Sequence, residues 1–282
     1  MKKQFVSLLV LSLATSFFLF SCDNKAKRNT GTLEFDSIQV NTTEHLFGDT
    51  AKPACNLVIN FAYVTQADDK VMKDSLNQYF QRLCFGDSTH TTSPQKAVEN
   101  YRKQYVSNYR NDLEELYQKE EKEFGDADQR AWFSYYKYIQ SHIQFYRKDL
   151  LAYRTRYEEY TGGAHGIYMT SFLNLDLRTL SPVHLNDLFA EGYEEALTDL
   201  LWNQLMADNR VTTRKELEDL GYGSTGDLTP TENFCIGPKG ITFLYNVYEI
   251  APYVMGAIEI TLPYEIMSHL LNDKSKILDS VK

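Results

Sequence analysis

The sequence predicts an α+β fold with mostly antiparallel sheets packed against a few helices, in two associated subdomains. Segments in which apolar residues alternate with polar ones, as in a strand with one buried face, occur in both halves of the chain. Segments with apolar residues at spacings of three and four, as in an amphipathic helix, stand between them. Helices and strands do not alternate one by one, as they would around a parallel sheet, which favours α+β.

The chain begins like a secretory signal. Lys2 and Lys3 precede an apolar run over residues 5–20 that is followed by a small residue and then Cys22. This run is shorter than the about 20 apolar residues that a membrane-spanning helix needs. We therefore predict a signal peptide over residues 1–21. The alternatives are an uncleaved anchor and an ordinary signal peptide that happens to end near a cysteine.

The residues before Cys22 resemble the bacterial lipobox. Leu19 lies three positions before the cysteine and Ser21 directly before it, although Phe20 is bulky for its position. The resemblance implies that the Cys22 thiol is acylated and becomes the first residue of the mature protein. The polar residues 22–32 would then be a flexible tether. We expect the protein to be anchored by Cys22 to a membrane of the cell envelope, on its periplasmic or surface face.

Residues 33–160 are expected to form the first subdomain. Ser93 followed by Pro94 is typical of a helix start, with a capping side chain before proline at the first helical position. In chain order we predict a strand from residue 33, a strand over 55–63, a helix over 72–83, a long helix from 94 to the charged run 119–123, and a hairpin of 132–146 with 150–160.

Residues 161–282 are expected to form the second subdomain, with the seam near residue 160. Thr213 and Glu216 fit a capping box at the start of a short helix. The remaining predicted elements are a strand over 167–177, a helix over 197–205, a loop over 221–231, a hairpin of 234–236 with 241–245, a strand over 258–262 and a terminal helix after residue 263.

The charge excludes some partners. The chain carries a net charge of −9, and loss of Lys2 and Lys3 with the signal leaves 27 basic against 38 acidic residues, a net charge of −11. Such a protein should repel nucleic acid and could attract a basic protein. Three cysteines remain after Cys22, so at least one thiol is free or pairs between molecules. They are Cys55, Cys84 and Cys235, and Cys55 is best explained as a small buried apolar residue.

Known catalytic and metal-binding motifs are missing from the sequence. The six histidines have no spacing that would place metal ligands on one helix face, and no zinc-protease, nucleophile-elbow or phosphate-loop motif occurs. We therefore predict no metal and no cofactor, and we assign no catalytic residue.

A glycine-rich segment over residues 157–166 is the first candidate site. It contains Tyr160, Gly162, Gly163 and His165 between two predicted strands. Glycine allows a ligand or another backbone to approach closely, and His165 could bind a ligand or act as an acid or base. The alternative is a tight turn in which His165 bonds to a buried backbone carbonyl.

A tyrosine-rich segment over residues 245–256 is the second candidate site. Tyr245, Tyr248 and Tyr253 combine apolar rings with polar tips, which suits an interface, and Glu249 adds a carboxylate. The alternative is a connection whose aromatic rings cover the core. Both segments join strands, so they could meet at one end of a sheet.

The blocks 160–166, 187–189 and 248–253, with Gly256, together resemble a domain of unknown function known from the lysozyme-sensing anti-sigma factor RsiV. Residues 33–160 are similar to the domain that precedes the catalytic domain in the peptidoglycan deacetylase PdaC. The resemblance implies an α+β fold without established chemistry, and in the anti-sigma factors the extracellular domain binds lysozyme. Val247 stands where such proteins often have proline.

Three functions remain open from the sequence. The first is a non-enzymatic, lipid-anchored envelope protein that binds a lysozyme-like muramidase or a cell-wall fragment. The second is an enzyme, or an enzyme accessory, acting on cell-wall sugar with His165 and Glu249 as acid and base. The third is a structural envelope module without a small ligand. An exposed aromatic patch would favour the first, and a closed pocket holding His165 and Glu249 the second.

Overall fold

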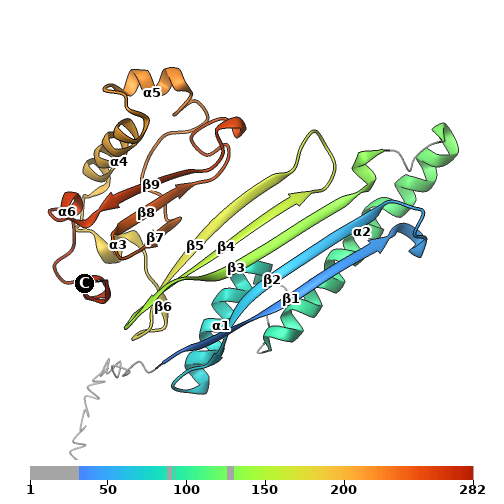
Figure 1. The fold of residues 1–282 in the computed structure, drawn as a ribbon, viewed down its shortest axis with the longest axis horizontal. Helices are drawn as coiled ribbons and strands as arrows, with labels where there is room; N and C mark the ends of the chain where they lie inside the picture. The colour runs from blue at the N-terminus through green and yellow to red at the C-terminus, as the bar shows by residue number, and fades with distance from the viewer. Residues whose placement is uncertain (1–31, 88–90, 92, 126–129, 282) are drawn as a thin grey trace, which may run out of the picture.

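Figure 1 shows the fold in a computed structural model of the chain, in which residues 32–87, 91, 93–125 and 130–281 are described. The predicted signal peptide at 1–21 lies outside the described residues, as do Cys22 and the tether up to residue 31. Among the described helices, none is long and apolar enough to cross a membrane.

The larger of two sheets has six strands in the order β1-β2-β3-β4-β5-β6. The alternation in the sequence is realised in β2, where Cys55, Leu57, Ile59 and Phe61 are all buried. The strands are β1 (Glu34–His45), β2 (Ala54–Gln66), β3 (Tyr135–Arg147), β4 (Leu150–Tyr160), β5 (Ile167–Asp176) and β6 (Ser181–Pro182).

Four of the five strand pairs in this sheet are antiparallel, and β2 with β3 is the parallel exception. Parallel neighbours need a crossover that returns the chain to the same end of the sheet. Here α1 (Lys70–Phe85) and α2 (Pro94–Phe124) provide that crossover. The prediction of an α+β fold with mostly antiparallel sheets is therefore confirmed.

Both crossover helices start at the side-chain caps that their sequences contain. The Asp69 carboxylate accepts from the backbone N–H of Met72, and the Ser93 hydroxyl accepts from that of Lys96. The helices pack on one face of the sheet, where the ring of Phe80 stacks on that of Tyr153 with 3.8 Å between centroids. The other face of the sheet is consequently free of these helices.

The predicted hairpin of β3 and β4 is confirmed with one correction. Trp132 lies in the short 3-10 helix Ala131–Phe133, so the first strand begins at Tyr135 and not at residue 132. Pairing then runs from Tyr136 opposite Tyr160 to the turn after Arg147.

The smaller sheet has three antiparallel strands, and α4 packs against its edge strand β9. The predicted capping box is present, since Thr213 and Glu216 bond reciprocally. The predicted terminal helix is only four residues long, which is one turn. The elements are α3 (Leu185–Leu188), α4 (Glu194–Asn209), α5 (Arg214–Leu220), β7 (Phe234–Ile236), β8 (Gly240–Tyr245), β9 (Ile258–Pro263) and α6 (Tyr264–Met267).

The larger sheet continues across residue 160, where the sequence suggested a seam. Strand β5 pairs with β4 along its whole length, from Ile167 opposite Glu159 to Asp176 opposite Leu150. The change from one sheet to the other therefore comes after β6. The sequence pattern marks the turn at residue 160 but gives no sign of which strands pair across it.

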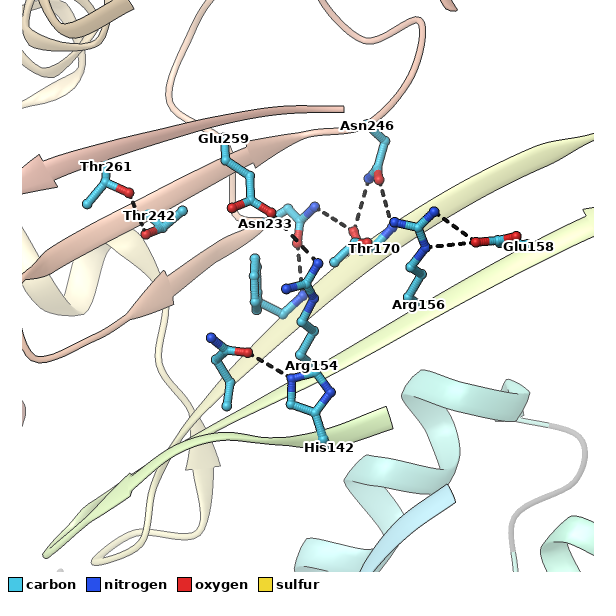
Figure 2. A network of polar contacts seen from close by, with 12 residues as sticks. His142, Arg154, Arg156, Glu158, Thr170, Asn233, Thr242, Asn246, Glu259 and Thr261 are labelled. Atoms are coloured by element: carbon cyan, nitrogen blue, oxygen red, sulfur yellow. Dashed lines mark hydrogen bonds and ion pairs between the residues drawn. The ribbon is translucent and has the colours of Figure 1, made fainter. Parts of the chain in front are cut away.

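Along the edge of β5 that faces the smaller sheet, asparagine side chains form the backbone hydrogen bonds that a neighbouring strand would otherwise form. The amide of Asn246 bonds twice to Thr170, accepting from its N–H at 2.7 Å and donating to its carbonyl at 3.1 Å. Asn233 accepts from the N–H of Phe172 and donates to the same Thr170 carbonyl, each at 2.9 Å. Figure 2 shows both amides reaching β5.

We call the contacts made by Asn174, Asn233 and Asn246 the asparagine joint. They run in both directions between the sheets, because Asn174 of β5 bonds to backbone groups at the edge of β7. Its Nδ2 donates to the carbonyl of Phe234 at 2.7 Å, and its Oδ1 accepts from the N–H of Ile236 at 2.9 Å. A small apolar cluster including Ala152, Phe172 and Leu244 lies between the two sheets. The two subdomains are therefore joined by hydrogen bonds and by buried apolar contact.

The three cysteines of the described chain are free thiols. Burial raises the pKa of Cys55 to about 11 and that of Cys235 to about 12, and it also raises the pKa of Cys84. The interpretation of Cys55 as a buried apolar residue agrees with its complete burial.

These thiols should resist alkylation in the folded protein. The thiolate is the reactive form, and a pKa raised from 9.0 to about 11 leaves Cys55 with ~100-fold less thiolate at pH 8. Timed iodoacetamide labelling with peptide mass spectrometry should show slow modification of all three in buffer and fast modification in guanidinium. Rapid labelling of Cys55 in buffer would contradict the burial described here.

Candidate functional site

The glycine-rich and tyrosine-rich segments meet in the structure. The hydroxyl of Tyr248 lies 3.2 Å from Nε2 of His165, which is within hydrogen-bonding distance. The ring of Tyr253 stacks on His165 with 4.4 Å between centroids, and its hydroxyl donates to the carbonyl of Gly166 at 3.0 Å. The segments belong to different sheets, so they meet where the two subdomains adjoin and not at one end of one sheet.

The glycines give the first segment its shape. Gly162 and Gly163 have φ of 94° and 101°, values that side-chain-bearing residues rarely adopt. Gly166 is required for space, because a Cβ there would lie 2.6 Å from the Tyr136 hydroxyl. Tyr160 closes the turn by donating to the carbonyl of Gly163 at 3.0 Å. The segment is thus a tight turn that also exposes His165.

His165 makes a hydrogen bond within the turn, but to the carbonyl of a residue that is not buried. Its Nδ1 lies 2.8 Å from the carbonyl of the next residue, Gly166, while Nε2 faces Tyr248. The imidazole is exposed, and the Gly166 carbonyl is shared with Tyr253. The local hydrogen bond orients the ring, and the exposed edge remains accessible to a partner.

Tyr248 has an unusual backbone for its residue type. Its φ is 70°, in the left-handed region, where a bulky side chain costs ~1–2 kcal/mol. Two hydrogen bonds within the turn hold it there: the Asn246 N–H donates to Glu249 Oε2 at 2.7 Å, and the Glu249 N–H donates to the Asn246 carbonyl at 3.1 Å. The conformation leaves the Tyr248 side chain 47% exposed beside His165.

Two of the predicted site residues are placed differently from the rest. Tyr245 is 3% exposed and donates to the carbonyl of Thr229, so it is a core residue of the second subdomain. Glu249 is exposed, but its carboxylate braces the turn at Asn246 and does not contact His165. The sequence could not separate these residues from Tyr248, because all lie within one short segment.

Further tyrosines extend this surface along the strands. Tyr136 and Tyr138 of β3 lie 5.3 Å apart between ring centroids, and Tyr136 lies 5.9 Å from Tyr160. Burial raises the pKa of Tyr136. Tyr168 of β5 packs edge-on against Tyr253 at 5.9 Å. We call the combined set the tyrosine surface, comprising Tyr136, Tyr138, Tyr160, His165, Tyr168, Tyr248 and Tyr253.

The sequence analysis did not identify the three strand residues of the tyrosine surface, Tyr136, Tyr138 and Tyr168, as candidate site residues. Tyr136 and Tyr138 are two positions apart, so they share a face of β3, and this spacing was the available signal. It did not reveal that the face is exposed. Tyr168 contacts Tyr253 only because β5 lies beside the second subdomain, which the sequence does not reveal.

The tyrosine surface lies at the far end of the larger sheet from the start of β1. Glu34 at the start of β1 pairs with Gln66, whereas Cys55 near the start of β2 pairs with Tyr135. The 12 residues of β1 run between these ends, and at ~3.4 Å per residue they span ~40 Å. Figure 1 shows the first strand entering at the end opposite the loop between β4 and β5.

The surface offers aromatic faces and hydrogen-bonding tips. Within the described part of the chain, no group of three or more His, Cys, Asp or Glu side chains is placed to hold a metal ion. The arrangement suits binding through stacked rings and hydroxyl groups.

Comparison with known proteins identifies two regions. A family profile described as "Deacetylase PdaC" matches residues 49–168, and one described as "Protein of unknown function (DUF3298)" matches residues 186–265. No curated protein matches the chain.

Two solved structures are similar over most of the chain. A DUF3298 family member from Bacteroides fragilis is 59% identical, covers 90% of this chain and 99% of its own, and superposes with a TM-score of 0.86. A DUF3298 family protein from Pseudomonas aeruginosa is 16% identical and covers 86% of this chain and 96% of its own. Its TM-score of 0.60 shows that the two proteins have a similar fold. The pair of regions fits a protein of the cell envelope. The chain belongs to the DUF3298 family, with a PdaC-like region ahead of its DUF3298 region.

Proposed function

We propose that this protein is a lipid-anchored envelope protein that binds a lysozyme-type muramidase through the tyrosine surface, without catalysing a reaction. The supporting observation is the aromatic cluster formed where the two candidate segments meet, in which His165 and Tyr248 are exposed and Tyr253 is half-buried. Tyrosine is enriched at interface centres, where its ring buries apolar area and its hydroxyl still finds a partner.

The position and charge of the molecule support this proposal. With an anchor at Cys22, the tyrosine surface lies ~40 Å along the sheet from the point where folded structure begins, so a soluble partner can reach it. The net charge of −11, expected once Lys2 and Lys3 are lost with the signal, favours encounter with a basic lysozyme. Charge of this kind steers association more than it sets affinity.

The enzymatic alternative has less support. A general acid and base must both reach the reacting atoms, yet the Glu249 carboxylate is engaged with the Asn246 N–H within its own turn. His165 is exposed beside Tyr248 and Tyr253 and is not enclosed.

Tyr248→Ala should weaken lysozyme binding ~30-fold, the equivalent of the ~2 kcal/mol typical of an interface anchor. Because the side chain is 47% exposed, the melting temperature should change little. Calorimetric titration of the full chain with several lysozyme classes, at low salt, measures the first effect, and thermal melts measure the second.

Tyr245→Ala provides the matched control from the same segment. Its side chain is buried, so its removal should cost ~3–5 kcal/mol of stability. If no lysozyme binds at tens of micromolar, the muramidase proposal is wrong. If binding occurs but is unaffected by Tyr248→Ala, the contact lies elsewhere.

A further inference from the structure

A second surface lies between the two sheets, on the side of β4 that the crossover helices do not cover. It is a cleft of about 250 Å³ lined from both subdomains. This volume is just below the ~300–1,000 Å³ of pockets for drug-sized ligands, so it suits one or two small rings. Clefts between subdomains are common places for ligands to bind.

The apolar part of the lining is aromatic. Phe145 and Phe172 belong to the apolar cluster that joins the sheets, and both border the cleft. Arg154 is held above Phe172, with its guanidinium carbon 5.6 Å from the ring centroid. Phe172 is only 9% exposed and its ring lies under this guanidinium, so the half-buried Phe145 is the ring that a ligand can reach beside the N–H donors of Arg154.

The polar lining offers both donors and acceptors, from Arg154, Glu259, Lys239, Gln144 and two threonines. Arg154 of β4 and Glu259 of β9 face each other across the two sheets with 3.8 Å between nitrogen and oxygen, longer than a hydrogen bond. Figure 2 shows these side chains pointing toward each other and the hydroxyls of Thr242 and Thr261 paired nearby, 2.8 Å apart. The donors of Arg154 and the acceptors of Glu259 thus retain bonding capacity.

This combination selects an uncharged, hydroxyl-rich ligand. Within the Arg154–Glu259 pair an anion would meet the carboxylate and a cation the guanidinium, whereas hydroxyl groups can bond to both. Lys239 also lines the cleft, but it is exposed to solvent, where its charge is screened. A sugar ring also presents an apolar C–H face that can pack on Phe145. We propose that the cleft binds an uncharged sugar ring of a glycan, with Arg154 and Glu259 bonding its hydroxyls. This site is independent of the muramidase proposal.

Saturation-transfer NMR tests the cleft, using the full chain in a detergent that has no sugar headgroup. The probes are N-acetylglucosamine trimer, maltotriose and, as a carboxylate-bearing sugar, N-acetylmuramic acid. At least one neutral probe should bind. Arg154→Met should weaken that binding at least tenfold, and so should the double change Thr242→Val with Thr261→Val, which keeps the side-chain volumes.

The control is Arg147→Met, an exposed arginine outside the cleft lining, which should leave sugar binding unchanged. Tyr248→Ala should also leave it unchanged, so failure of this site is distinguishable from failure of the tyrosine surface. Three results would overturn the proposal: no binding of a neutral probe, unchanged binding in both cleft variants, or binding of the acidic sugar alone that strengthens in Glu259→Gln.

Discussion

Cys22→Ser should release the protein from the membrane fraction almost completely. The signal peptide predicted for residues 1–21 ends directly before this cysteine, in a lipobox-like sequence. Acyl chains contribute ~0.8 kcal/mol of membrane affinity per buried methylene, and stable anchoring takes more than one chain. Without the thiol that would carry this lipid, we expect the acidic mature chain to have little other attraction to anionic bilayers.

Fractionation and metabolic labelling with a fatty-acid analogue measure this effect. The wild type should sediment with membranes and carry label, and Cys22→Ser should do neither. Ser21→Ala is the matched control, since a small residue before the cysteine is kept and anchoring should survive. A Cys22→Ser protein that remained labelled and membrane-bound would exclude acylation at this position.

Most strands and helices could be predicted because their signals are local. The alternation in β2 and the caps at Ser93 and Thr213 depend on residues close together in the chain. The partners of a strand depend on distant residues, so the parallel pair of β2 with β3 could not be read from the sequence. The continuation of the sheet past residue 160 was missed for the same reason.

The candidate site was predicted in part. Both segments were recognised from composition, and their contact through His165 and Tyr248 agrees with the expectation that they could meet. Burial within a tyrosine-rich loop depends on which side chain turns inward, so Tyr245 could not be separated from Tyr248. The cleft at Arg154 and Glu259 had no signal, because its residues come from strands of two different sheets.

The stabilising role of the asparagine joint could not be predicted from the sequence either. In the sequence, Asn174, Asn233 and Asn246 look like ordinary polar residues, and asparagine is disfavoured in strands. In the structure their amides supply the donors and acceptors that a neighbouring strand would supply. An amide side chain carries both groups, which explains why this residue type suits the joint.

Asn174→Ala should destabilise the protein by ~2–6 kcal/mol, because it leaves the buried carbonyl of Phe234 and N–H of Ile236 without partners, at ~1–3 kcal/mol each. For a chain of this size that shift lowers the melting temperature by ~5–15 °C. Denaturant titration and calorimetry measure both quantities. Asn41→Ala, at an exposed position of β1, should stay within ~0.5 kcal/mol of the wild type.

The shape of the melting curve tests whether the joint makes the two subdomains one folding unit. Asn174 bonds the edge of β7, and Asn233 and Asn246 bond that of β5, so each sheet has backbone groups that only the other satisfies. Unfolding of one subdomain would leave those groups without their partners in the other, and we therefore expect a single transition in the wild type. Asn174→Ala should lower that transition without splitting it, since the bonds to Thr170 and Phe172 remain. Two independent, reversible transitions in the wild type would contradict the joint, and an unchanged melting temperature in Asn174→Ala would show that water replaces its bonds.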